Sequence, residues 1–240
     1  MFIPFHIAWK EIRGYFSSWI AYVLCAGWLL LSGLTFVSLL GAAAQGAPFS
    51  LVPLYQNLII VFLFLTPLLT MRLLAEERAT GTLELLFTSP LTPWQVTMGK
   101  WLGALAFCAV LLLLTLHFPF FVFQYGTLDA GPVWGSTIAL ICLAAAFCAF
   151  GVFCSSLCDS QIVAGFLTFG GLLLSWMLAW PAATAPDNRL AAVAAQFSVF
   201  AHFARMLGGA IDTQDLIFFA SLSFFFLFAT TRVLESRQWK

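Results

Sequence analysis

The sequence predicts an all-α polytopic membrane protein, a single domain over residues 1–240 with six transmembrane helices. Hydrophobic residues make up 62% of the chain and charged residues only 8%, whereas soluble domains carry about 25% charged residues. Long intervals also lack any charge, and the one between Arg13 and Arg72 has room for two helices of about 20 residues each. These observations exclude a water-soluble globular domain, and we expect no nucleic-acid partner.

Polar breaks, several of them rich in Gly and Pro, set the boundaries of the spans. The stretch GAAAQGAPFSLVP separates the first two spans, YGTLDAGP the third from the fourth, and Asp159 and Ser160 the fourth from the fifth. GAAAQ resembles a signal-peptide cleavage site, but residues 19–40 exceed the usual apolar core of about 7–15 residues, so we expect this span to be retained. The predicted spans cover residues 17–41, 53–74, 96–124, 132–156, 161–181 and 215–234.

The distribution of basic residues predicts which side each loop occupies. Eight of the ten lysines and arginines fall on the side of the N-terminus: Lys10, Arg13, Arg72, Arg78, Lys100, Arg232, Arg237 and Lys240. The other side holds Arg189 and Arg205. Because cytoplasmic loops carry the excess of lysine and arginine, we expect both termini and the loop after the second span in the cytoplasm.

Two further segments are predicted to lie along the membrane surfaces. In residues 1–16, Phe5 and Trp9 recur at helical spacing while Lys10 and Arg13 point elsewhere, which indicates a helix in the membrane interface or an N-terminal extension of the first span. Residues 183–213 are more polar than the predicted spans, but they are more apolar than a loop that is surrounded by water. We expect short helices there that dip into the outer interface, with acids at the start of the last span.

A charged loop follows the second span. Insertion into lipid costs about 2.5–3.5 kcal/mol for each ionised group, so Glu76, Glu77, Arg78 and Glu84 must face water or a partner. Thr80 and Gly81 are typical of a helix end. Downstream, Thr92, Pro93 and Gln95 predict the capped start of the third span.

Between these signals, residues 82–89 predict a short amphipathic helix. Leu83, Leu86 and Phe87 give it one apolar face, and Pro90 ends it. From the pattern alone, this face meets either lipid headgroups or another protein.

The chain carries no recognisable catalytic centre. It lacks a phosphate-binding GxxxxGK[ST] loop, and its three histidines, His6, His117 and His202, lie far apart in sequence without carboxylate neighbours. The six cysteines form no metal-binding or disulfide pattern and are interpreted as packing residues. Gln56 and Asn57 either line a substrate path or bond between helices. His117 is either a pathway residue or a neutral packing group.

The segment AEERATGTLELLFTSPLTPWQVTMGKWLGA resembles the signature of ABC-2 type permeases, the membrane subunits of one class of ABC exporters. The matching positions are Glu76, Glu77, Arg78, Gly81, Thr82, Leu83, Glu84, Leu86, Ser89, Pro90, Gly99 and Lys100. The C-terminal stretch, from GGAID to LESRQWK, is similar to the gliding-motility and nitrous-oxide-reductase-maturation branch of that family.

The resemblance implies a role for most of the chain. The helix at 82–89 would be the coupling helix that docks on a separate ATPase, with residues 1–16 as the interface helix and 183–213 as re-entrant helices. The partners would be that ATPase, which binds ATP and Mg²⁺, and a second permease copy or a related chain in the bacterial inner membrane. The chain itself would hold no cofactor or metal and would not be an enzyme.

Two other functions stay open at this point. One is a membrane anchor for an ABC ATPase in a motility or assembly machine, which would keep the same coupling helix. The other is an ion-coupled secondary transporter, which should carry acids near the middle of the membrane. The acids of this sequence lie at the span ends.

Overall fold

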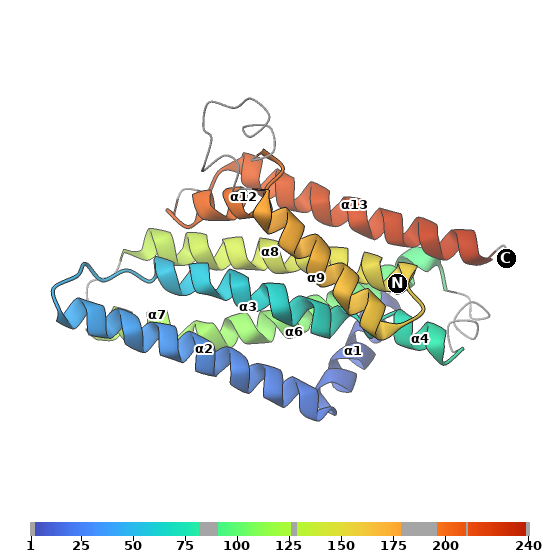
Figure 1. Ribbon diagram of the computed structural model, residues 1–240, viewed down its shortest axis with the longest axis horizontal. Helices are drawn as coiled ribbons and strands as arrows, with labels where there is room; N and C mark the ends of the chain where they lie inside the picture. Colours follow the sequence, from blue (N-terminus) through green and yellow to red (C-terminus); the bar gives the residue numbers. More distant parts are fainter. Residues whose placement is uncertain (1–2, 82–90, 126–128, 179–195, 210, 239–240) are drawn as a thin grey trace.

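The computed structural model describes residues 3–81, 91–125, 129–178, 196–209 and 211–238. In these residues the regular secondary structure is all helical, and there is no strand. The long helices run along one axis as an elongated bundle (Figure 1). Helix α1 (Ile3–Phe16), helix α4 (Ala75–Ala79) and the C-terminal part of α13 (Thr213–Gln238) lie at one end of it, hereafter the α1 end.

Five helices of the described residues are long and apolar enough to cross a membrane. They are α2 (Trp19–Ala44), α3 (Val52–Thr70) continued by α4, α6 (Pro93–Thr115) continued by α7 (His117–Tyr125), α8 (Ala130–Leu157) and α13. Helix α9 (Gln161–Met177) is apolar but shorter, and it falls within the predicted fifth span. The all-α membrane fold is therefore confirmed, while the number of six spans stays a prediction.

Helix α8 is the centre of the bundle. It packs against α3, α6, α9, α13 and the short helix α12 (Val199–Met206). Small residues on α8 permit this close packing. At Gly151, an added Cβ would lie 2.2 Å from Thr70 Oγ1 of α3, so only glycine fits there. By contrast, just three residues of α2, Ala21, Trp28 and Ser32, are buried, which leaves most of this helix facing outward.

Helix α1 lies obliquely across the start of the long helices (Figure 1). It ends at Phe16, and the Ser18 hydroxyl caps the next helix by accepting from the Ile20 amide at 3.3 Å. Residues 3–16 therefore do not continue the first span as one unbroken helix. Helix α1 packs mainly against α6, where Gly99 and Gly103 leave room for its backbone.

Several local predictions from the sequence can be compared with the structure. The capping box of Thr92 and Gln95 is confirmed, with both reciprocal hydrogen bonds present at the start of α6. The predicted helix end is also confirmed, because α4 stops at Ala79 and Gly81 adopts a left-handed φ of 71°. The predicted coupling helix at 82–89 and residues 183–195 of the predicted re-entrant segment lie outside the described residues.

Candidate functional site

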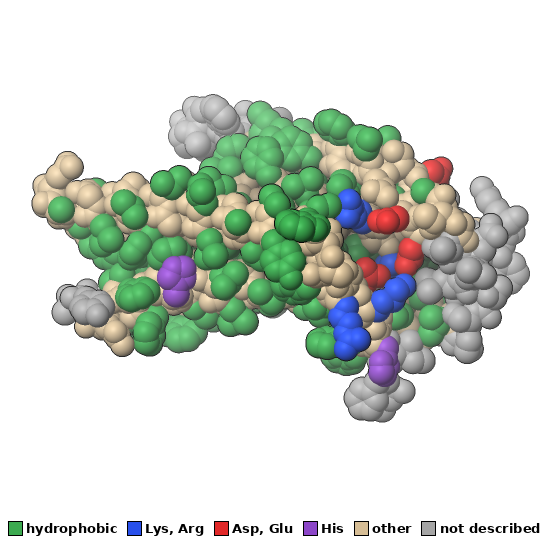
Figure 2. All heavy atoms as spheres, turned by 90° about the horizontal axis from the view of Figure 1, so that it is seen from below, with side chains coloured by type: hydrophobic (Ala, Val, Ile, Leu, Met, Phe, Trp, Pro, Cys, Tyr) green, Lys and Arg blue, Asp and Glu red, His purple; other side chains and the backbone are tan. Residues whose placement is uncertain are grey.

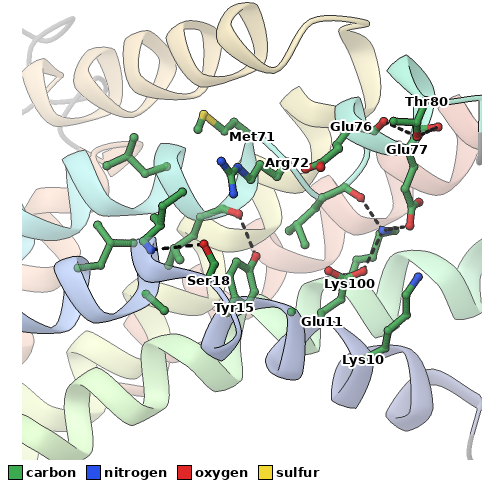
Figure 3. A pocket seen from close by; sticks show the side chains of 17 residues that line it. Lys10, Glu11, Tyr15, Ser18, Met71, Arg72, Glu76, Glu77, Thr80 and Lys100 are labelled. Atoms are coloured by element: carbon green, nitrogen blue, oxygen red, sulfur yellow. Dashed lines mark hydrogen bonds and ion pairs between the residues drawn. The ribbon is translucent and has the colours of Figure 1, made fainter.

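A buried lysine joins three helices at the α1 end. The Lys100 side chain of α6 is 2% exposed, and its Nζ lies 3.1 Å from Glu11 Oε1 of α1 and 2.8 Å from Glu77 Oε1 of α4. Nζ also donates a hydrogen bond to the Leu73 carbonyl oxygen (Figure 3). A buried ammonium group is costly unless it is paired and hydrogen-bonded. Glu11, Glu77 and Lys100, hereafter the lysine cluster, satisfy both conditions.

Two glycines explain how α1 comes close enough to contribute its carboxylate. An added Cβ at Gly99 would lie 2.6 Å from Ile7 Cβ, and one at Gly103 would lie 2.7 Å from Glu11 Cβ. Gly99 and Gly103 are four residues apart on α6, as are Ile7 and Glu11 on α1, so one face of α1 lies along one face of α6. The glycine before Lys100 in the GK sequence is thus part of the same packing that places Glu11 on the lysine.

Helix α8 holds α4 from the other side. The Ser155 hydroxyl accepts hydrogen bonds from the amides of Leu74 and Ala75, both at 3.1 Å, and so caps the start of α4. Arg78 donates to the Ser156 carbonyl oxygen at 2.9 Å and to the exposed Asp159 carboxylate at 2.7 Å. Helix α4 is therefore tied to both α8 and the lysine cluster immediately before residues 82–89.

A cavity of about 880 Å³ opens beside the lysine cluster, between α1, α2 and the end of α3. Arg72 and Glu76 line it, and Figure 3 shows both beside the cluster. In Figure 2, basic and acidic side chains gather at this end of a face that is otherwise largely hydrophobic. The Tyr15 hydroxyl in the wall donates to the Leu69 carbonyl oxygen at 2.9 Å. Burial raises the pKa of Tyr15 well above its usual value, so the hydroxyl remains a neutral donor.

A second ionic cluster lies near the start of α13. The Asp215 carboxylate is fully buried, 2.6 Å from His202 Nδ1 of α12, and it accepts a hydrogen bond from Arg205 Nη2. His202 Nε2 faces the Gln196 carbonyl oxygen at 2.9 Å. The inference that the histidines lack carboxylate neighbours is wrong for His202, because the turn between α12 and α13 brings Asp215 back to it. Asp215, His202 and Arg205 are hereafter the aspartate cluster.

The remaining predicted site residues do not converge on one place. Gln56, Asn57 and His117 are all exposed, and the His117 ring packs against Phe118 with ring centroids 3.8 Å apart. Phe5, Trp9, Lys10 and Arg13 lie on the exposed side of α1, where the Arg13 guanidinium sits 5.1 Å from the Trp9 ring centroid. The rest of the predicted coupling set lies outside the described residues: Thr82, Leu83, Glu84, Leu86, Phe87 and Pro90.

Within the described part of the chain, no three His, Cys, Asp or Glu side chains gather as a metal site. The buried thiols Cys108 and Cys148 lie 3.7 Å apart, packed between α6 and α8.

A match to a protein-family model decides the family. The family model described as ABC-2 family transporter protein matches residues 5–196, which include Glu11, Glu77 and Lys100. The chain belongs to the ABC-2 transporter family. It is a multi-pass membrane protein and a permease subunit of an ABC transporter. None of the curated proteins matches the chain.

Membership of this family indicates how the permease and its partner subunit divide their roles. Members of the ABC-2 family are generally non-catalytic membrane components, and the family implies a partnership with an ABC ATPase subunit. The matched region runs from α1 through α9 and contains the whole lysine cluster. The aspartate cluster begins at His202, beyond the matched residues.

Sequence reasoning missed Glu11, Ser155 and Asp215 as site residues. Glu11 had a readable signal, because Gly99 and Gly103 are spaced by four residues, and small residues at that spacing indicate a closely packed partner helix. Ser155 lacked such a signal, since a serine near the end of an apolar helix is common and its role depends on the position of α4.

Proposed function

We propose that this permease moves its cargo outward across the bacterial inner membrane, driven by a separate ATPase subunit that docks on residues 82–89. The observation that carries the proposal is the lysine cluster. The ATPase would press on a segment that directly follows α4, and Glu77 of α4 is bonded to a lysine that also binds α1. A displacement of α4 would thus reach α1 and α6 together.

The buried position of Lys100 suits this role. Exposed ion pairs contribute little and exchange with water, whereas removing one partner of a buried pair costs about 3–5 kcal/mol. Lys100 is 2% exposed and Glu77 is 18% exposed, so we expect the pair to stay formed when the helices move. Ser155 adds a second fixed point, since it holds the start of α4 on the central helix α8.

The other parts of the proposal concern partners and orientation. ATP and Mg²⁺ would be bound by the ATPase, and a second copy of this permease or a related chain would complete the pathway. Both termini would lie in the cytoplasm, as the distribution of lysine and arginine predicts. The α1 end of the bundle, where α1, α4 and the last turns of α13 lie together, supports this arrangement (Figure 1).

The first experiment is co-purification. The tagged permease is expressed with its genomic neighbours, solubilised gently, and analysed by mass spectrometry for a stoichiometric ATPase with a phosphate-binding loop. Glu84→Lys should release or uncouple the ATPase while the permease remains inserted, and Arg232→Gln, a charge change at the end of α13, serves as the control. Absence of any such ATPase, or equal recovery with Glu84→Lys, would count against the docking segment.

A second experiment separates coupling from docking. Glu77→Gln should leave the ATPase bound but lower the stimulation of its activity by the permease, because the link from α4 to Lys100 is weakened. A nucleotide-dependent transport assay in vesicles then tests export itself. An intact complex that hydrolyses ATP without moving cargo would favour the anchor function.

The orientation is tested by chemical labelling. Thr80→Cys places a thiol at the exposed end of α4, and an impermeant thiol reagent should reach it only from the cytoplasm. The unaltered protein controls for its native cysteines. Labelling of the added thiol from outside would overturn the topology.

A further inference from the structure

Not all of the charged side chains that line the 880 Å³ cavity are ion-paired within the described residues. The lysine cluster has two carboxylates for one ammonium group, and the exposed Lys10 also lines the cavity. Arg72 and Glu76 remain. Both are exposed, both line the cavity, and neither forms an ion pair within the described part of the chain.

Arg72 and Glu76 lie one helical turn apart. The Glu76 amide donates to the Arg72 carbonyl oxygen at 3.3 Å, which places the two side chains on the same side of the chain. Figure 3 shows both side chains at the upper edge of the cavity, above Tyr15 and Ser18. The cavity therefore presents one positive and one negative group, one helical turn apart, and neither is ion-paired within the described residues.

Another part of the cavity lining is apolar. It includes Ile20 and Leu24 of α2 and Leu68 and Leu69 of α3, and Leu68 is 45% exposed. These residues belong to helices long enough to cross the membrane, close to the ends of their apolar segments. With these helices spanning the membrane, the apolar lining would continue into the hydrocarbon region and the charged pair would lie at the depth of the headgroups.

We propose that this cavity binds one phospholipid with a phosphoethanolamine headgroup, taken from the leaflet on the α1 side. The phosphate binds the guanidinium of Arg72, whose planar fork suits two phosphate oxygens. The primary ammonium of the headgroup pairs with the Glu76 carboxylate. The acyl chains lie along Leu24 and Leu68. A net-neutral pair of opposite charges matches this zwitterionic headgroup better than a purely anionic one.

The lipid would fill the space between α1 and the first two spans. It would contact α1 and α3 at the same place where Glu11 and Leu73 meet Lys100. Lipid binding at this cavity does not depend on the ATPase coupling proposed above.

The test measures bound lipid directly. The full-length protein is equilibrated in nanodiscs with equal amounts of phosphatidylethanolamine and phosphatidylglycerol of the same acyl chains, and retained lipids are counted by native mass spectrometry. We expect one retained phosphatidylethanolamine per chain. Arg72→Gln should weaken retention of both lipids about tenfold, as expected from the loss of a charged hydrogen bond. Glu76→Gln should abolish the preference for phosphatidylethanolamine and leave overall retention intact.

Two further variants keep the test decisive. Leu68→Trp fills the apolar wall without touching the charged pair, and it should reduce retention even if Arg72→Gln fails to fold. Arg232→Gln removes an arginine elsewhere at the α1 end and should retain lipid as the unaltered protein does. Unchanged retention in Leu68→Trp, or in a folded Arg72→Gln, would overturn the site. Equal retention of the two lipids by the unaltered protein would overturn the headgroup assignment.

Discussion

The lysine cluster and the aspartate cluster are both sets of three ionisable residues, but they differ in what they connect. Lys100 binds carboxylates that are 89 and 23 positions away in sequence and belong to two other helices. Asp215 binds two residues of the helix just before its own, 13 and 10 positions away. The first cluster joins distant parts of the chain, and the second closes a local turn.

The two clusters also differ in how they could respond to a lost partner. In the lysine cluster the buried member is the single cation, and the side chains of its carboxylate partners are about one-fifth exposed. In the aspartate cluster the single anion is fully buried and His202 is buried beside it, while Arg205 is 51% exposed and can turn to water. We therefore expect the lysine cluster to tolerate a missing member less well.

The largest effect is expected for Lys100→Met. Two carboxylates would then face each other without a cation in a partly buried place, which costs about 3–5 kcal/mol of stability. Thermal unfolding of the purified protein measures the loss. Lys10→Met, on the exposed side of α1, is the control and should change stability by less than about 0.5 kcal/mol. Adding Glu11→Gln and Glu77→Gln to Lys100→Met should restore much of the loss, and no recovery would mean that packing rather than charge dominates.

A smaller effect is expected for Asp215→Asn, about 2 kcal/mol, since the buried carboxylate is replaced by a neutral group while Arg205 can be hydrated. Hydrogen exchange should rise in α12 and stay unchanged in α1. Arg205→Gln provides the comparison and should cost less. If Asp215→Asn destabilised the protein more than Lys100→Met, the contrast between the clusters would be reversed.

Ser155→Ala should cost about 1 kcal/mol, because the amides of Leu74 and Ala75 lose their shared acceptor. Exchange of the amides in residues 71–79 should accelerate about fivefold. Ser156→Ala is the matched control, since among the described residues that hydroxyl bonds to the Phe153 carbonyl oxygen of its own helix alone, at 2.7 Å. Equal exchange in the two variants would show that α4 does not depend on this cap.

The smallest effect is expected for Asp159→Asn. The Asp159 side chain is 81% exposed, and Arg78 keeps its hydrogen bond to the Ser156 carbonyl oxygen. Exposed ion pairs contribute about 0–1 kcal/mol, so unfolding should shift by less than about 0.5 kcal/mol. A loss comparable to that of Ser155→Ala would show that Asp159 belongs to the fixed support of α4.

The features predicted well from the sequence are those that depend on neighbouring residues. Thr92 and Gln95 form their capping box, and Gly81 ends α4, because each motif is decided within four residues. The five helices of spanning length follow from long apolar stretches, which are also continuous segments of the sequence. Motif residues Glu77, Arg78 and Lys100 were singled out by resemblance, and the structure supplies their partners.

The features that sequence reasoning missed depend on which helices meet. Nothing within ten positions of Glu11 indicates Lys100, and the contact exists only because Gly99 and Gly103 admit α1. His202 and Asp215 belong to different helices, and their contact follows from the turn at Gly209, which has a φ of 84° and packs against Pro132 of α8. The spacing of the two glycines indicates that a helix packs closely there, but a single sequence does not indicate which helix it is.

The distance along the chain between α1 and its seat on α6 has a consequence for biosynthesis. Glu11 leaves the ribosome 89 residues before Lys100, and at roughly 5–20 residues per second this delay is on the order of ten seconds. During that time neither the groove of Gly99 and Gly103 nor the lysine exists. Helix α1 can therefore take its place on α6 only after the second and third apolar helices have been made. It is synthesised before α2 and α3 but reaches its final packing after them.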